Sequence, residues 1–175
     1  SLSVFAQWTF CRKDRLDRIQ YRGNLLTSRN SYFSSLNMKM QVISDLHQEF
    51  GFTDMSFEKA DLVILAGDVN LGTKGIEWIK SAIKNIPVIY VLGNHEYYKG
   101  SYPKTLNSIK GLSMDTNVHV LENASLVIDD ITFHGATLWT DFALLGDSRL
   151  NVSICQGKMN DNKMTRKDPS YCKLR

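Results

Sequence analysis

Three short motifs in this chain combine the residue types that bind metal ions. They are Ser44–His47 (S-D-L-H), Gly67–Asn70 (G-D-V-N) and Gly93–Glu96 (G-N-H-E). Together they supply carboxylates, imidazoles and an amide oxygen, which are hard or borderline ligands for divalent cations. Each motif directly follows an apolar run, so we expect each to lie where a strand ends and a loop begins.

The apolar runs that precede the motifs predict three strands, at residues 40–44, 61–66 and 88–92. The second run, D-L-V-I-L-A, is aliphatic almost without a break, which is typical of a strand buried on both faces. Between the second and third strands, residues 72–84 place an isoleucine every three or four positions. That spacing makes one apolar stripe on a helix, and Asn85 is expected to end it.

The second half of the chain predicts shorter elements. A weaker helix is expected at 104–112, and strands are expected at 118–121, 125–128 and 131–134, the last two joined by a tight turn at Asp129-Asp130. A further helix is expected from Val152 to about Arg166. Helices and strands thus alternate first and a meander follows, which indicates an α/β layered fold with a later antiparallel part.

Such a fold would bring the motifs together, because open α/β sheets bind ligands beyond the carboxyl ends of their strands. Asp45 and His47 are two positions apart. In extended chain both would point to one side, with Leu46 packing on the other. Gly67 and Gly93 are expected to let the chain turn sharply after a buried strand.

The order D-x-H, G-D, G-N-H-E resembles the calcineurin-like metallophosphoesterases, specifically the bacterial-type phosphohydrolases. The resemblance runs from Met40 to Asp141, and residues 133–141 (F-H-G-A-T-L-W-T-D) are similar to a later strand and loop of bacterial members. It implies a fold of mixed sheets flanked by helices. It also implies a hydrolase, or phosphatase, in which a dinuclear metal site activates water to attack a phosphate ester.

The resemblance also implies a role for each motif residue. Asp68 would bridge two metal ions, Asp45 and His47 would hold the first ion with it, and Asn94 would hold the second. His95 would lie just outside the metals as the catalytic residue, donating a proton or hydrogen bond to the leaving oxygen or phosphoryl group. The cofactors would be two divalent transition metal ions (Mn, Fe, Zn or Ni), since these ligand types do not choose among them.

The set of ligands expected of this family is incomplete in this chain. Members normally add an isolated histidine and a G-H-x-H pair late in the sequence, whereas the four histidines here are His47, His95, His119 and His134. We therefore expect a domain that is truncated at its C-terminus and binds the second ion weakly. The alternative is a catalytically impaired binding module of the same fold.

Four side chains near these motifs receive a structural interpretation. His134 is expected to be a hydrogen-bonded strand histidine, and His119 is expected to pack within its strand. Glu96 and Glu49 are expected to start a helix or to support a ligand from outside the coordination sphere, rather than to bind metal.

Residues 1–37 differ from the rest of the chain, with six basic and two acidic side chains and no sustained period. We interpret them as an upstream extension, disordered or non-native, with a targeting peptide as the alternative. Residues 38–175 are interpreted as the N-terminal portion of a calcineurin-like phosphoesterase domain. The charge of this portion is nearly balanced, so a nucleic-acid partner is not indicated.

The remaining sequence features concern compartment and partners. Cys11, Cys155 and Cys172 are scattered, with no C-x-x-C, which favours reduced thiols and a cytoplasmic location. No apolar run approaches the length of a membrane span, so no membrane partner is expected. The expected partner is a phosphate-ester substrate. A zincin is set aside because Lys99 stands where H-E-x-x-H needs its second histidine.

Overall fold

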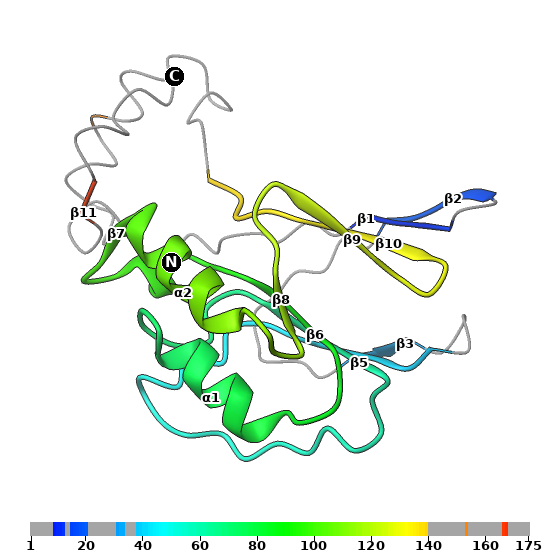
Figure 1. The fold of residues 1–175 in the computed structure, drawn as a ribbon, viewed down its shortest axis with the longest axis horizontal. Coiled ribbons are helices and arrows are strands. Elements are labelled where there is room, and N and C mark those ends of the chain that lie inside the picture. Colours follow the sequence, from blue (N-terminus) through cyan, green and yellow to red (C-terminus); the bar gives the residue numbers. More distant parts are fainter. Residues whose placement is uncertain are drawn as a thin grey trace.

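Two sheets pack against each other, and two helices cover the outer face of the first sheet (Figure 1). The computed structural model describes residues 38–139 without a break, together with 9–12, 15–20, 31–33, 153 and 166–167. This is the layered α/β architecture that the sequence predicts, with a parallel sheet flanked by helices.

The first sheet has five strands in the order β3-β4-β5-β6-β8. Their bounds are Ser31–Phe33 (β3), Met40–Ile43 (β4), Leu62–Ala66 (β5), Val88–Val91 (β6) and Val118–Val120 (β8). Strands β4, β5, β6 and β8 run parallel, while β3 pairs antiparallel with β4. The three strands that precede the motifs are thus adjacent and parallel, and their carboxyl ends meet at one edge.

The second sheet is antiparallel, in the order β2-β1-β10-β9. Its strands are Thr9–Arg12 (β1), Arg15–Gln20 (β2), Ala124–Ile128 (β9) and Ile131–Gly135 (β10). The predicted turn at Asp129-Asp130 is confirmed, since Ile128 pairs with Ile131 across it. A separate parallel pair joins β7 (Ser101–Tyr102) to β11 (Arg166–Lys167).

Helices α1 (Lys74–Ala82) and α2 (Lys104–Ser113) make the crossovers between the parallel strands, and a 3-10 helix, η1 (His95–Tyr97), follows β6. The isoleucine stripe of α1 is buried as predicted, with Ile76, Ile79 and Ile83 at most 1% exposed. The helix is shorter than the predicted 72–84. Gly72 adopts a left-handed φ of 57° before it, and Asn85 a φ of 62° after it.

Strand β5 separates two hydrophobic cores. Val63 and Leu65 face the core beneath α1 and α2, whereas Leu62 and Ile64 face the core between the two sheets. All four side chains are fully buried, which confirms the prediction of a strand covered on both faces. Because closely packed side chains cover both faces of β5, the first sheet is expected to deform little, so the loops at its edge can be held in fixed positions.

Two predicted segments are described only in part. The helix predicted from Val152 to about Arg166 falls almost entirely outside the described residues. Within residues 1–37 the structure describes β1, β2 and β3, which extend the two sheets. That residues 1–37 form an upstream extension stays a prediction.

The packing of the two sheets can be tested at Phe133, which is fully buried between them. Phe133→Ala is expected to lower the free energy of unfolding by about 3–5 kcal/mol, because it removes a large side chain and leaves a cavity. Val127→Ala on the neighbouring strand, where the side chain is 59% exposed, should cost no more than about 0.5 kcal/mol. Urea unfolding measures both, and similar losses in the two variants would contradict this packing.

Candidate metal site at the carboxyl edge of the parallel sheet

The loops after β4 and β5 are joined by backbone hydrogen bonds that continue the pairing of the two strands. The amide of Asp45 donates to the carbonyl of Gly67 (3.1 Å), that of His47 to Asp68 (2.9 Å), and that of Gln48 to Val69 (3.0 Å). The first two motifs are therefore held in register beyond the ends of their strands.

Within these loops the backbone leaves the extended conformation at the motif residues themselves. Asp45, His47 and Asp68 have φ values of 55°, 45° and 54°. Left-handed backbone is uncommon for residues other than glycine, and it concentrates at functional sites. The expectation that Asp45 and His47 share a side because the chain is extended is wrong. Leu46 is nevertheless buried in the core, as predicted.

The two motif glycines serve different purposes. Gly67 has a φ of 92°, so it makes the sharp turn that the sequence predicts. Gly93 has no such φ, and its requirement is steric. A Cβ atom there would lie 2.2 Å from Asp68 Oδ1 and 2.8 Å from the amide nitrogen of Asp68. The loop after β6 can therefore approach Asp68 only because residue 93 has no side chain.

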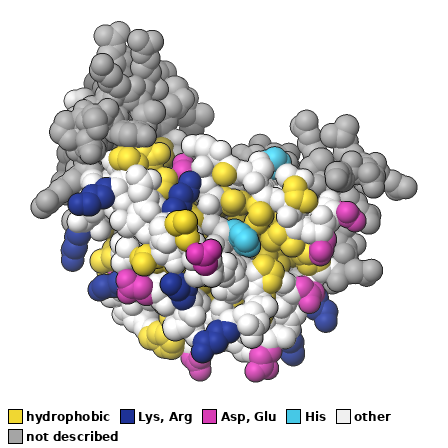
Figure 2. All heavy atoms as spheres, viewed as in Figure 1, with side chains coloured by type: hydrophobic (Ala, Val, Ile, Leu, Met, Phe, Trp, Pro, Cys, Tyr) yellow, Lys and Arg dark blue, Asp and Glu magenta, His cyan; other side chains and the backbone are white. Residues whose placement is uncertain are grey.

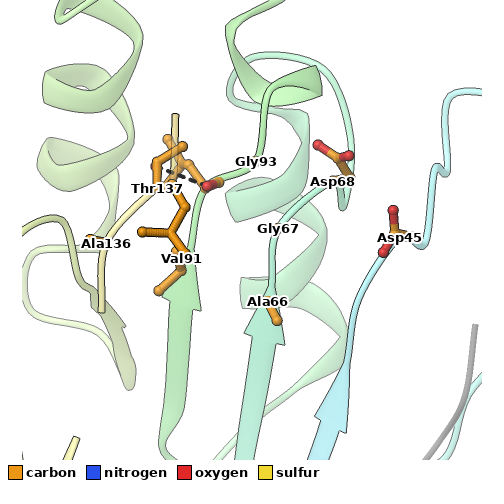
Figure 3. A pocket seen from close by; sticks show the side chains of 10 residues that line it. Asp45, Ala66, Gly67, Asp68, Val91, Gly93, Ala136 and Thr137 are labelled. Atoms are coloured by element: carbon orange, nitrogen blue, oxygen red, sulfur yellow. Dashed lines mark hydrogen bonds between the residues drawn. The ribbon is translucent and has the colours of Figure 1, made fainter. Parts of the chain in front are cut away.

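These loops gather three ligand atoms at one point. His47 Nε2 lies 3.7 Å from Asp45 Oδ1 and 3.9 Å from Asp68 Oδ2. One ligand atom from each of the three residues lies within 4.8 Å of the others. Figure 3 shows Asp45 and Asp68 at the ends of adjacent strands, beside a small pocket that Ala136 and Thr137 close on the far side.

Asp68 is the most buried of the three, with its side chain 10% exposed. Burial raises the pKa of this carboxyl group and the negative charge of Asp45 adds to the effect, while a hydrogen bond from the His95 amide to Oδ1 (2.9 Å) opposes it. A buried carboxylate next to a second one is costly unless a cation compensates the charge. A divalent cation between Asp45, His47 and Asp68 would supply that compensation.

The spacing of the three atoms also fits a metal. Ligands that each lie about 2.1 Å from one ion are separated from each other by roughly 3–3.5 Å, slightly less than the separations seen here. Two carboxylates and an imidazole are donors that Mn, Fe, Zn and Ni accept. The donor set and the left-handed backbone thus fit a divalent metal ion, and the ligand assignments remain predictions.

Glu96 lies behind the site and ties two of its loops together. Its carboxylate accepts hydrogen bonds from the amides of Asp68 (3.1 Å), Val69 (2.8 Å) and Gly93 (2.8 Å), and from the hydroxyl of Tyr90 (2.8 Å). Its side chain is completely buried. Burial and the neighbouring Asp68 raise the pKa of Glu96 to about 7, although hydrogen bonds from the Val69 amide, the Tyr90 hydroxyl and its own backbone act in the opposite direction. Glu96 therefore supports the ligand loops from behind, one of the two roles expected for it.

The third motif places its polar side chains at the same edge. Asn94 donates from Nδ2 to the hydroxyl of Tyr98 (2.9 Å). Because the nitrogen makes this bond, Oδ1 is the amide atom that a metal would take. The ring of His95 lies against both Tyr98 and His47, with centroid separations of 4.4 Å and 4.3 Å. His95 thus lies beside the candidate ligand His47, and its catalytic role stays a prediction.

Glu49 contacts the site through both histidines. Its Oε1 lies 2.6 Å from His95 Nδ1 and 3.1 Å from His47 Nδ1. Burial acts to raise the pKa of Glu49, but hydrogen bonds from its own amide, His47 and His95 outweigh it, so the net pKa is lowered. The sequence predicts a supporting role for Glu49 but does not identify His47 and His95 as its partners. The local sequence feature that points to the contact with His47 is that Glu49 lies two residues after it.

The other two histidines lie away from this cluster. His134, on β10, is exposed and pairs through Nδ1 with Ser125 Oγ at 2.6 Å, which confirms the expected hydrogen-bonded strand histidine. His119 lies in β8 opposite Ile89, as a strand residue of the first sheet. Neither belongs to a group of potential metal ligands among the described residues.

This chain thus combines a parallel sheet, a second sheet packed on it, and acidic and imidazole side chains gathered at the strand ends. The sequence family of calcineurin-like phosphoesterases matches residues 38–166, which is well over half of the chain. The chain therefore belongs to this family, and the resemblance seen in its motifs is confirmed.

One curated relative is an uncharacterised protein, L509, of Acanthamoeba polyphaga mimivirus. It is 27% identical over 153 residues, an alignment that covers 73% of this chain and 55% of L509. The chain thus spans about half the length of the curated relative that it matches. No solved structure matches the chain. Among the described residues, no helix has both the length and the apolar character needed to cross a membrane.

The support from Glu96 can be measured as stability. Glu96→Ala in the metal-free protein is expected to lower the free energy of unfolding by about 3 kcal/mol or more, because it leaves several buried donors unpaired. Glu77→Ala is the matched control, since the Glu77 carboxylate accepts an exposed hydrogen bond from the Thr73 hydroxyl. Urea unfolding compares the two, and equal, small losses would contradict a tying role for Glu96.

The steric requirement at Gly93 gives a second test. Gly93→Ala is expected to displace Asp68, because the added Cβ atom would overlap its carboxylate. Calorimetry should then show Mn²⁺ affinity lowered by at least about tenfold, as when a metal ligand loses its support. Gly111→Ala is the control, because open space surrounds that position in α2 and alanine favours helix by about 0.5–1 kcal/mol. Unchanged Mn²⁺ affinity in the Gly93 variant would show that Asp68 does not need this close approach.

Proposed function

We propose that this domain hydrolyses phosphate esters with the help of divalent metal ions bound at the carboxyl edge of its parallel sheet. One observation carries the proposal. Asp45, His47 and Asp68 present three ligand atoms within 4.8 Å of one another, and the ring of His95 packs against His47. Membership of the calcineurin-like phosphoesterase family supports the same conclusion.

The residues available for the metals divide into two groups. Asp45, His47 and Asp68 would hold the first ion, while Asp68 and Asn94 would contribute to the second. Bound divalent cations would offset the charge of the phosphate and lower the pKa of a coordinated water molecule, so that water can attack at neutral pH. Asp68 would take part in both groups, and its carboxylate also accepts a hydrogen bond from the His95 amide on the loop after β6.

His95 is the residue that we assign to the leaving group. Its Nδ1 is engaged by Glu49, and its ring is held between Tyr98 and His47. Nε2, on the other edge of the ring, is then the atom that can donate a proton or hydrogen bond to the departing oxygen or the phosphoryl group.

The proposal is confined to the phosphoester class, because monoesters, diesters, nucleotides and phosphoproteins would all present the same reacting group. Figure 2 shows basic and acidic side chains interspersed on one face of the molecule. That arrangement does not single out a substrate of one charge type.

A second candidate function rests on the second ion. Of the described residues, the resemblance assigns only Asp68 and Asn94 to this ion, and His134 is engaged by Ser125 on an exposed strand. A domain of this fold whose metal site is incomplete would serve as a binding module rather than as a catalyst. Metal analysis separates the two candidates: two equivalents of Mn, Fe, Zn or Ni support the enzyme, and none after reconstitution supports the module.

We further propose that residues 38–175 belong to the phosphoesterase domain and that residues 1–37 are an extension. The family match begins at residue 38, which supports this boundary. The cytoplasmic location is also a proposal, supported by three scattered cysteines without C-x-x-C spacing.

Asp68 offers the sharpest test of the proposed function. Asp68→Asn is expected to abolish measurable Mn²⁺ binding and to lower hydrolysis of p-nitrophenyl phosphate and bis(p-nitrophenyl) phosphate by at least about 10²-fold, because the bridging charge is lost. Chelation of the metal should abolish wild-type turnover, and Mn²⁺ should restore it.

Asp130→Asn is the matched control, since Asp130 lies in the β9–β10 turn. It should leave metal binding and turnover unchanged. Hydrolysis that persists in the wild type after chelation, and also in the Asp68→Asn variant, would exclude the proposed site.

A further inference from the structure

We propose that Glu49 is a positioning residue that sets the ring orientation and tautomer of two histidines at once, the metal ligand His47 and the leaving-group histidine His95. The proposal deepens the proposed function and rests on it. In this proposal Oε1 of Glu49 holds the ring of the candidate metal ligand, His47, and the ring of the proposed proton donor, His95, in fixed orientations.

The geometry places a single acceptor between two rings. Glu49 Oε1 lies 2.6 Å from Nδ1 of His95 and 3.1 Å from Nδ1 of His47. The rings themselves meet edge to face, with a centroid separation of 4.3 Å and an interplanar angle of 71°. An ionised carboxylate can only accept hydrogen bonds, so both Nδ1 atoms must be the donors.

Donation from Nδ1 decides what the other nitrogen of each ring can do. In a neutral imidazole with hydrogen on Nδ1, Nε2 carries a lone pair. For His47 that atom is the one near Asp45 Oδ1 and Asp68 Oδ2, at 3.7 Å and 3.9 Å, where a metal would take it. A carboxylate that fixes the tautomer of a metal-binding histidine is a recurrent support for such ligands. For His95, Nε2 can donate only when the ring carries hydrogen on both nitrogens, and the bond from Nδ1–H to Glu49 is available in that form as well.

The chain holds Glu49 in place through the turn that carries His47. The amide of Gln48 donates to Val69 (3.0 Å), and the amide of Phe50 donates to His47 (2.9 Å). The Glu49 side chain is only 9% exposed, and its second oxygen, Oε2, is buried with no hydrogen-bond partner among the described residues. Burying a carboxylate with one oxygen unpaired is unfavourable. The two hydrogen bonds that Oε1 accepts offset that cost.

A metal ion held directly by His47, Glu49 and His95 is the competing interpretation, since one ligand atom from each lies within 4.8 Å of the others. The separation of 2.6 Å between His95 Nδ1 and Glu49 Oε1 favours a hydrogen bond over shared metal coordination. Two ligands of one ion at about 2.1 Å lie roughly 3 Å or more apart, whereas 2.6 Å is a charge-assisted hydrogen bond.

The first experiment reads the histidine tautomers without metal or substrate. Long-range ¹H–¹⁵N spectra of the metal-free protein should show His47 and His95 with hydrogen on Nδ1. Glu49→Ala should shift both rings toward the other tautomer or toward a mixture, while His119 and His134 stay unchanged. Spectra in which neither ring responds to Glu49→Ala would overturn the proposal.

The second experiment separates positioning from folding by comparing Glu49→Gln with Glu58→Gln, a control at an exposed glutamate. Glu49→Gln is expected to weaken Mn²⁺ binding through His47 by about 10–100-fold. It should also lower kcat more for a phenyl than for a p-nitrophenyl phosphate ester, because phenolate departs poorly without a proton. KM should change less than kcat, and Glu58→Gln should match the wild type in every measurement.

The outcomes also keep this inference separate from the proposed function. If the wild type neither binds Mn²⁺ nor hydrolyses these esters, the proposed function fails, and the ring spectra still decide whether Glu49 sets the two tautomers. If the wild type is active but Glu49→Gln retains its metal affinity and its response to the leaving group, the role of Glu49 is overturned and the proposed function stands. Stoichiometric metal bound in place of the Nδ1 hydrogens would instead establish the competing metal site.

Discussion

The carboxylate of Glu96 is the contact on which the arrangement of the metal-ligand loops depends. It receives three backbone amides, two from the loop after β5 and one from the loop after β6, and a hydroxyl from Tyr90 within the sheet. Without it, the loops that carry Asp68 and Asn94 would have buried amides with no partner. The position of the most buried candidate ligand is therefore set by a residue that is not itself a ligand.

The loops that Glu96 joins have backbone conformations and a buried charge that would be unfavourable without the surrounding structure. Three candidate ligands have left-handed φ values, and Asp68 is buried close to Asp45. Such features persist where surrounding contacts over-determine them, and here those contacts are the two-sided core and the backbone bonds between the loops. A bound cation would relieve the charge.

Much of the fold follows from local patterns in the sequence. The aliphatic run of β5 predicted a strand with two covered faces, and the isoleucine spacing in α1 predicted its buried stripe. Both succeed because burial of apolar side chains imposes a period that the sequence records directly. Helix ends were less predictable. Gly72 and Asn85 take left-handed conformations that shorten α1, and such turns depend on the neighbouring loops as well as on residue type.

The sequence by itself determined the family, the order of the main elements between residues 40 and 134, and the candidate ligand types at the strand ends. Only the tertiary structure decided how those ligands meet. Asp45 and His47 converge through left-handed backbone rather than extended chain. Gly93 is needed because it has no side chain. One oxygen of Glu49 joins His47 to His95, and His95 lies 46 positions after Glu49 in the chain. These relations join segments distant in sequence, so no local pattern carries them, and they become visible only when the parallel strands bring their ends to one edge.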